Sequence, residues 1–384
     1  MSKRFWQMAA CCLVSAAVTA VGIFMLGTWL FHRVTGDAPT AMRLMYAVSL
    51  LKRDFNGELT NKQLWDGAIK GAVDAAGDPY TVYLNEKDYQ RMHEMSDGSF
   101  GGIGIVFGKR GDDYVVISAL ADNPGAKAGI KSGDIIMAVD GTPTEKLHMD
   151  QVASKIRGKK GTKVELELKT KDGSLRKVTV VRADIKNQSV GGTMLEGTKV
   201  GYIRIAVFND DTAPDFKKEY EKLEQQGMEA LVLDLRANPG GLLTDCVEVA
   251  GMLVPKGPIV SVEYRNGERR VENSALEKVK YPLAVLVDHG SASAAEIVAG
   301  AVKDTKAGKL FGVKTFGKGS VQSVYPLDGD TAVKITVAKY YTPAGICIDK
   351  IGIEPDVVVE LPEHATVDTQ LEAAKQYLLG ELNK

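Results

Sequence analysis

The sequence predicts a multidomain protein with an N-terminal transmembrane helix, a helical segment, a β-rich module and a larger α/β domain. Three observations lead to this prediction. Residues 5–31 contain no charged side chain, short β-rich runs punctuated by glycine fill residues 97–184, and apolar strands alternate with helical patterns from residue 185 onward. A chain of 384 residues is also long enough to build two or three domains, each with its own core.

The composition excludes several classes of protein. The 48 basic and 49 acidic residues give a net charge of −1, which argues against a nucleic-acid partner. Only four cysteines occur, and none has the spacing of a zinc site, so we expect neither a disulfide scaffold nor a structural metal. The sequence implies no organic cofactor.

The first predicted element is a membrane anchor within residues 1–33. The 27 residues from Phe5 to Phe31 exceed the roughly 20 that a helix needs to cross a bilayer. Lys3 and Arg4 precede this run, which favours a cytoplasmic N-terminus and a single-pass protein whose remaining domains lie outside the cytoplasm. A cleavable signal peptide ending near Ala20 is the alternative, but the apolar run continues well beyond that residue.

Residues 34–96 are predicted to form a helical region. Apolar residues recur at helical spacing between Met42 and Leu51, and Asn61 is a suitable N-cap for a helix over residues 62–76. The Asp-Pro-Tyr sequence at residues 78–80 then interrupts the helical pattern, because a residue before proline avoids the helical conformation.

The β-rich module at residues 97–184 contains two informative glycine motifs. GGIGI at residues 101–105 lets backbone N–H groups face a ligand, since glycine has no Cβ. NPGAKAGIKSGDII follows at residues 123–136. Strands are expected at residues 103–107, 114–118, 135–139, 164–169 and 177–182, with one helix at 149–157.

Together the two glycine motifs resemble those of a bacterial PDZ domain. The resemblance implies that a peptide C-terminus adds as a strand to this module. The residues expected to contact the peptide are Gly102, Ile103, Gly104 and Ile105. A basic cluster at residues 155–163 is most simply a solvated surface, with the alternative that Arg157 contacts the neighbouring domain and reports peptide occupancy.

Residues 185–384 have the alternating pattern of an α/β domain with a C-terminal helix. Expected strands are residues 200–206, 230–235, 283–287 and 309–313, and expected helices are residues 213–226, 242–253, 294–304 and 367–381. Two of these strands end in motifs that could take part in catalysis. The turn at residues 238–241 can offer backbone N–H groups to an oxyanion, and the serines of Gly-Ser-Ala-Ser at residues 290–293 stand where a helix begins.

Each motif also has a structural explanation. Serines at a helix start often act only as caps. Lys318, between two glycines after an apolar strand, is unusual, because a desolvated lysine loses its proton and can act as a general base. Residues 312–318 imitate the start of a phosphate-binding loop, but Gly319 replaces the required Ser or Thr, which argues against a nucleotide-dependent enzyme.

The motifs DLRANPGG, GSASAAEI and TFGKGSVQ, in this order behind a PDZ-like domain, resemble those of the carboxyl-terminal processing peptidases, also called tail-specific proteases. The resemblance covers roughly residues 60–360. It implies a serine endopeptidase in which Ser293 is the nucleophile, Lys318 is the general base and Gln322 orients the lysine.

The same resemblance assigns further roles. The amide of Ala294, with that of Gly240 or Gly241, matches the oxyanion hole, and Asp304 holds a position sometimes grouped with the catalytic residues. The family pattern also implies ATP-independent cleavage of protein C-terminal tails, and a homodimer formed through the N-terminal helical region and the C-terminal helix.

Three alternatives stay open. His289, four residues before Ser293, allows a Ser-His arrangement. Cys347 is a rival nucleophile, although a partly buried free thiol is the simpler interpretation. An inactive PDZ scaffold that binds C-termini without turnover is the third, and the intact set of Ser293, Lys318 and Gln322 argues against it.

Overall fold

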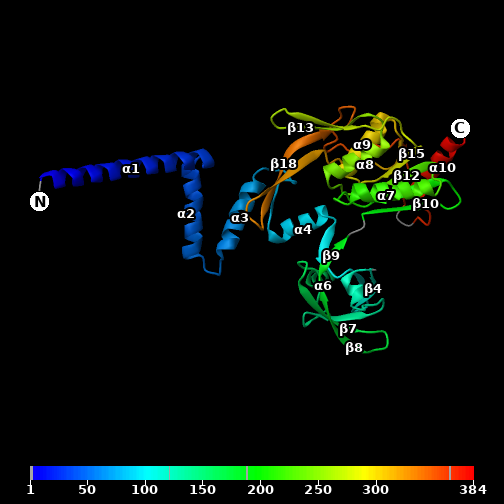
Figure 1. Cartoon of the computed structure of the whole chain (residues 1–384), viewed down its shortest axis with the longest axis horizontal. Helices are drawn as coiled ribbons and strands as arrows, with labels where there is room; N and C mark the ends of the chain where they lie inside the picture. The colour runs from blue at the N-terminus through cyan, green and yellow to red at the C-terminus, as the bar shows by residue number, and fades with distance from the viewer. Residues whose placement is uncertain (1–2, 121, 187–188, 363–364) are drawn as a thin grey trace. The chain divides into compact units, whose positions relative to one another are not determined.

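The computed structural model describes residues 3–120, 122–186, 189–362 and 365–384, and their side chains except at residues 3–11 and 34–35. The chain divides into two compact units, residues 1–76 and 77–384. The first unit consists of three helices, α1 (Lys3–Thr35), α2 (Ala38–Asp54) and α3 (Asn61–Asp74) (Figure 1).

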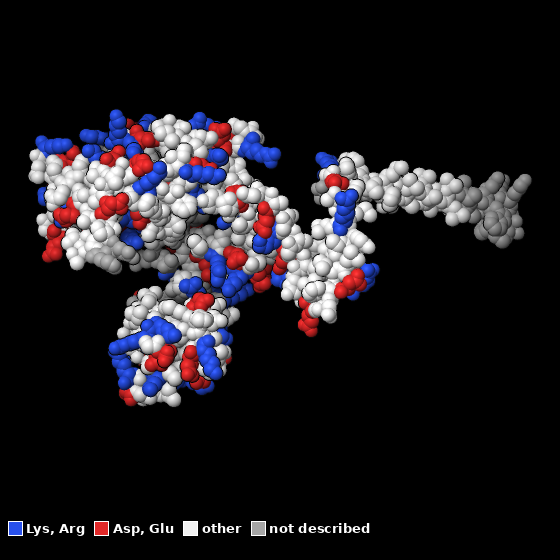
Figure 2. All heavy atoms as spheres, turned by 180° about the vertical axis from the view of Figure 1, so that it is seen from behind, with Lys and Arg blue, Asp and Glu red and all other residues white. Residues whose placement is uncertain are grey.

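Helix α1 contains one stretch, Cys12–Arg33, that is long and apolar enough to cross a membrane. Figure 2 shows no acidic or basic side chain along this stretch until its C-terminal end. A signal sequence near the N-terminus can also be long and apolar enough to meet this criterion, so the finding fits both interpretations of the first 33 residues.

The start of α3 differs by one residue from the prediction. Thr60, not Asn61, is the N-cap: its side chain accepts a hydrogen bond from the Gln63 N–H (3.2 Å), and the Gln63 side chain accepts one from the Thr60 N–H (2.9 Å). This reciprocal pair is a capping box, which satisfies two N–H groups at once and so outcompetes a lone asparagine cap.

The core of the second unit is a six-stranded sheet in the order β10-β11-β12-β15-β16-β19. Only β10 runs antiparallel to its neighbour. The strands are β10 (Val190–Met194), β11 (Val200–Ile205), β12 (Ala230–Asp234), β15 (Leu283–Val287), β16 (Lys309–Gly312) and β19 (Val357–Val358). Every residue of β12 and β15 is buried, as expected for parallel strands covered by helices on both faces.

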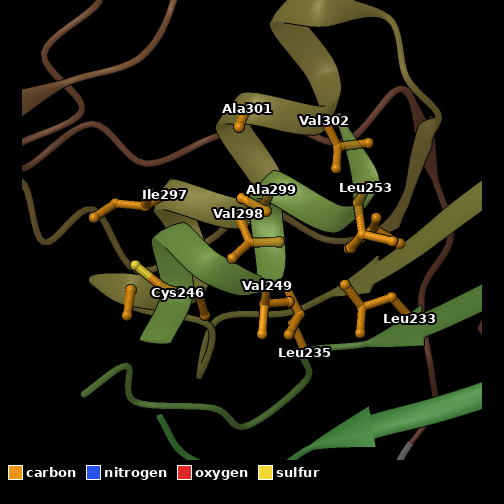
Figure 3. Packing of buried hydrophobic residues seen from close by; sticks show 14 of the residues in the cluster. Leu233, Leu235, Cys246, Val249, Leu253, Ile297, Val298, Ala299, Ala301 and Val302 are labelled. Carbon is orange, nitrogen blue, oxygen red and sulfur yellow. The ribbon is translucent and has the colours of Figure 1, made fainter. Parts of the chain in front are cut away.

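Alternate residues of these strands enter two different hydrophobic cores. Leu233 and Val285 pack with helices α7 (Thr212–Gln225), α8 (Leu243–Leu253) and α9 (Ala294–Thr305), whereas Val232 and Leu286 pack with α10 (Thr369–Leu382). Figure 3 shows α8 and α9 in contact through side chains that include Val249 and Val298. The four helices and four strands predicted for this domain are present, with ends shifted by at most two residues.

A second, antiparallel sheet was not predicted. Its order is β1-β18-β13-β14, with β17 also paired to β18. The strands are β1 (Val82–Leu84), β13 (Gly257–Tyr264), β14 (Arg269–Ser274), β17 (Ser320–Pro326) and β18 (Ala332–Tyr341). The prediction that residues 34–96 are helical is therefore wrong at β1, because pairing with the distant β18 decides its conformation; helix α4 (Glu86–Ser96) follows as a helix.

The β-rich module forms a six-stranded sheet with two short helices (Figure 1). Its elements are β3 (Ile105–Arg110), β4 (Asp113–Ala119), β5 (Ile135–Val139), β6 (Thr142–Pro143), β7 (Lys163–Lys169), β8 (Leu175–Val181), α5 (Pro124–Lys127) and α6 (Met149–Ile156). The first predicted strand begins later than expected, because Gly102 still pairs with Ala183 in a separate ribbon of β2 (Ser99–Gly102) and β9 (Ala183–Lys186).

Candidate active site

A cleft of about 590 Å³ brings together residues that are far apart in the sequence. Ser293 lies at the start of α9, Lys318 lies two residues before β17, and Gln322 lies on β17. Six residues of the predicted site line this cleft: Ser293, Lys318, Gln322, Gly240, Gly241 and Ala294. The fold therefore assembles in one place what the sequence contains in three separate motifs.

The backbone at Ser293 is strained. Its φ of 54° and ψ of −115° are unusual for a residue with a side chain, and such conformations persist only where the surroundings hold them. Ser293 is partly accessible in the cleft, whereas Ser291 is fully buried and donates from its hydroxyl to the Leu235 carbonyl (2.8 Å). Ser291 thus fixes the turn, and Ser293 is the one of the two serines that lines the cleft.

A buried carboxylate, that of Glu296, joins the serine and lysine segments. It accepts hydrogen bonds from the N–H groups of Ser293 (2.9 Å), Gly317 (2.8 Å) and Lys318 (2.8 Å), and from the Thr315 hydroxyl (2.5 Å). Its side chain is fully buried. Four donors on two segments thus converge on one carboxylate, which fixes the distance between the two segments.

Tyr340 of β18 forms a second link between the same two segments. Its hydroxyl lies within hydrogen-bond distance of the carbonyl oxygens of Ser293 (3.2 Å) and Lys318. Burial raises the pKa of Tyr340, so its phenol stays protonated and able to donate. Glu296 binds the N–H groups of these two residues and Tyr340 binds their carbonyl groups, so the backbone is held on both sides.

Lys318 lies in an environment that favours its neutral form. Burial lowers the pKa of Lys318, the nearby positive charge of Lys334 lowers it further, and the Glu296 carboxylate opposes both effects. Among the residues that the structure describes, no carboxylate forms an ion pair with Lys318 and no hydrogen bond joins its amine to Ser293. The lowered pKa of Lys318 is what a general base requires, but the described structure shows no hydrogen bond from its amine to the Ser293 hydroxyl.

Gly240, one of the residues predicted for the oxyanion hole, lies close to Ser293 and Ala294. A Cβ atom on Gly240 would lie 2.7 Å from the Cβ of Ser293 and 2.9 Å from the Ala294 nitrogen, so only glycine allows this approach. The Gly240 N–H donates to the Asn238 side chain (2.8 Å). That donor is therefore occupied, whereas the Gly241 N–H has no hydrogen-bond partner among the described residues, and the shared oxyanion hole with Ala294 stays a prediction.

Two further predicted residues, Gln322 and Asp304, form hydrogen bonds with groups other than the Lys318 amine. The Gln322 amide lines the cleft but donates to the hydroxyls of Ser320 (2.9 Å) and Thr336 (3.2 Å), so its role in orienting Lys318 stays a prediction. Asp304 accepts a hydrogen bond from the Ala344 N–H (2.9 Å), a contact that fixes the loop after β18.

The alternative catalytic residues lie elsewhere. His289 is exposed and lines a separate cavity with Asp288 and Arg236. Cys347 pairs with Tyr341 in an isolated bridge and does not line the cleft. In the described parts of the chain, no group of three or more potential ligands could hold a metal ion.

Glu296 and Tyr340 were missed by the sequence analysis. The Ser-x-x-Glu spacing of Ser293 and Glu296 is a sequence signature of a helix N-terminus and offered one signal. Tyr340 begins the Tyr-Tyr-Thr-Pro-Ala-Gly stretch at residues 340–345, which the family resemblance includes, but its role was not visible because its partners Ser293 and Lys318 come from other segments.

Three family models match this chain. Residues 199–359 match peptidase family S41, residues 115–170 match the PDZ domain, and residues 33–88 match the N-terminal domain of the activating protease CtpB. The PDZ prediction for the β-rich module is thereby confirmed.

Whole-chain similarity agrees with the family models. The carboxy-terminal processing protease CtpA of Bacillus subtilis (strain 168) is 36% identical over 349 residues, which cover 90% of this chain and 74% of that protein. CtpB of the same organism is 34% identical over 324 residues, covering 83% and 67%. Among solved structures, a photosystem II D1 C-terminal processing protease matches with a TM-score of 0.52 and 32% identity, covering 89% of this chain and 91% of that one. A PDZ domain ahead of an S41 peptidase domain, together with this identity along most of the sequence, shows that the chain belongs to the carboxy-terminal processing proteases, a family of serine proteases.

Proposed function

We propose that this protease is anchored in the cell membrane and cleaves the C-terminal tails of proteins without ATP, with Ser293 and Lys318 as its catalytic dyad. One observation carries the proposal: a strained serine and a partly buried lysine with a lowered pKa line the same cleft. A serine and a partly desolvated amine in one cleft are the two groups that a Ser-Lys mechanism uses, and strain of the kind seen at Ser293 is common at active sites.

The proposed reaction begins with a proton transfer. The neutral amine of Lys318 takes the proton from the Ser293 hydroxyl, and the Ser293 oxygen bonds to the scissile carbonyl carbon. The negative charge that develops on the carbonyl oxygen is stabilised by the N–H groups of Ala294 and Gly241. The C–N bond then breaks, the Lys318 ammonium protonates the leaving amine, and water, deprotonated by Lys318, hydrolyses the acyl-enzyme.

The PDZ domain is proposed to capture the substrate tail. Strand β3 is an edge strand of its sheet, so its open edge is available for an added peptide strand. Gly104, just before β3, has a φ of 70°, and a Cβ atom there would lie 2.3 Å from the Asn123 Cβ. These constraints keep the predicted carboxylate-binding loop, with Gly102, Ile103 and Ile105, in one conformation.

Arg157 is proposed to report occupancy of the PDZ domain. Its guanidinium lies 4.5 Å from the centre of the Phe100 ring on β2. The next residue, Gly158, donates its N–H to the Gly101 carbonyl (3.0 Å), so the end of α6 is fixed to the β2–β9 ribbon. A movement of α6 on peptide binding would therefore pass to this ribbon.

The first unit is proposed to anchor the enzyme and to contribute to a homodimer. The candidate span in α1 supports the anchor, with the N-terminus in the cytoplasm and the catalytic domain on the opposite side. Helix α2 exposes large apolar side chains that a second copy would cover: Met42, Leu44, Met45, Tyr46 and Leu51.

An unstructured peptide with a free C-terminus tests the proposed activity. We expect the purified protein to cleave it without ATP, and to cleave the same peptide more slowly when its C-terminus is amidated, because the PDZ loop loses the carboxylate that it binds. Chromatography of the products gives both rates. Binding without turnover would favour the inactive scaffold, and turnover only with ATP would contradict the proposal.

A further inference from the structure

Tyr80 makes a direct contact with Lys318 that no part of the proposed mechanism uses. The Lys318 Nζ atom lies 4.9 Å from the centre of the Tyr80 ring. This distance is within the range in which an aromatic face and a lysine interact. Tyr80 comes from the segment that precedes β1, so a residue from the start of the second unit reaches the catalytic lysine.

The turn that carries Tyr80 is fixed by hydrogen bonds. The Asp78 carboxylate accepts one from the Tyr80 N–H (3.3 Å) and one from the Thr81 hydroxyl (2.6 Å). The Thr81 oxygen in turn accepts one from the Thr336 N–H of β18 (3.0 Å). The turn is thus tied to the strand beside the cleft, and Tyr80 has a defined position rather than that of a mobile surface side chain.

Charged groups from several elements surround this pair. Glu296 of α9 and Lys334 of β18 act on Lys318, as described above. Burial raises the pKa of Tyr80, and the carboxylates of Asp349, Asp78 and Glu296 raise it further. Tyr80 is therefore a neutral phenol beside the amine and supplies no anionic partner. Helix α4 adds an ion pair to the cleft lining, Arg91 with Asp88 (3.8 Å).

We propose that Tyr80 is a positioning residue for Lys318: its ring covers the amine, excludes water from it and so keeps it in the neutral form that the base requires. The proposal rests on the assignment of Lys318 as the base. It adds a residue to the site that lies outside the three motifs and outside the residues that line the cleft.

The ring has two opposing effects on the amine. Its face attracts the ammonium form, which favours protonation, and its bulk displaces water, which disfavours it. Burial of lysine shifts its pKa by several units in known cases, more than a single aromatic contact does. Burial is the largest cause of the lowered pKa of Lys318, so we take the exclusion of water as the larger effect of the ring and expect loss of the ring to raise this pKa.

The test is the pH dependence of kcat/KM for peptide cleavage in variants of the full-length chain. For Tyr80→Ala we expect the acid limb to move to higher pH by about one unit, with about a tenfold loss at pH 7 that is largely recovered at pH 9. Tyr80→Phe should restore the wild-type limb. Tyr80→Leu, which excludes water without an aromatic face, should also keep the limb at or below its wild-type position.

One control and one replacement variant complete the test. Tyr325 lies on β17 and is 49% exposed, so Tyr325→Ala should leave the acid limb in place. If Tyr80→Ala does not fold, the smaller truncation Tyr80→Val carries the same expectation. A loss of activity equal at every pH, or a limb that moves in Tyr80→Leu as far as in Tyr80→Ala, would overturn the proposal.

Failure of this inference is distinguishable from failure of the proposed mechanism. If Lys318→Ala retains activity, Lys318 is not the base and the mechanism itself is wrong. If Lys318→Ala is inactive while Tyr80→Ala keeps the wild-type pH profile, the dyad stands and only the role of Tyr80 is refuted.

Discussion

Replacing Ser293 by alanine is expected to lower kcat for peptide cleavage by about 10⁴-fold or more, because the proposed nucleophile is lost. The fold should be retained, since the Ser293 contacts that hold α9 are made by its backbone: its N–H donates to Glu296 and its carbonyl accepts from the Ile297 N–H. Peptide turnover and circular dichroism of the same preparation check both expectations.

Ser291→Ala is the matched control for this experiment. Ser291 stands two residues away and is fully buried, and its hydroxyl bonds to the Leu235 carbonyl. Its loss should cost about 1–3 kcal/mol of unfolding free energy while turnover by the folded enzyme stays measurable. If turnover survives in Ser293→Ala and disappears in folded Ser291→Ala, the nucleophile is Ser291 and the assignment of Ser293 is wrong.

Replacing Glu296 by alanine is expected to have the next largest effect, on both stability and activity. Four donors would lose their acceptor: the N–H groups of Ser293, Gly317 and Lys318, and the Thr315 hydroxyl. Each buried donor left without a partner costs about 1–3 kcal/mol, so we expect the free energy of unfolding to fall by about 3 kcal/mol or more. In molecules that still fold, kcat should fall by at least about 100-fold, because the two catalytic segments are no longer tied together.

Glu296→Gln refines this prediction. The amide keeps the size of the side chain and one acceptor oxygen, but its NH₂ group would face N–H donors, so both effects should be intermediate. Glu277, with an 86% exposed side chain, supplies the control: Glu277→Ala should change the free energy of unfolding by no more than about 0.5 kcal/mol. Urea unfolding gives the stabilities. Wild-type kcat in Glu296→Gln would show that the carboxylate does not position the dyad.

The α/β core was predictable because its signal is local. The residues of β12 and β15 are apolar except Asp234 at the end of β12, as expected for strands buried on both faces, and each expected helix shows its period within one segment. The antiparallel sheet was missed for the opposite reason. β14 is largely exposed and β1 has only three residues, so both depend on pairing with strands that are distant in the sequence.

The candidate site divides in the same way. Ser293, Lys318 and the glycine turn lie in recognisable motifs, so the resemblance alone selected them. Tyr80 and Tyr340 reach the site from other segments, and no role was assigned to either, so only the fold connects them with Lys318. Glu296 lies between these cases, since its spacing from Ser293 was visible but its bonds to the lysine segment were not.

The rate of peptide cleavage by Lys318→Ala, measured beside His289→Ala, tests the central claim most directly. His289 lies four residues before Ser293 in the sequence, but it is exposed and lines a different cavity. Lys318 is distant in the sequence but lines the same cleft as Ser293. The Ser-Lys dyad predicts a loss of about 10³-fold or more for Lys318→Ala across the pH range, and near wild-type cleavage for His289→Ala. Full activity in Lys318→Ala with loss of activity in His289→Ala would contradict the dyad and make histidine the base.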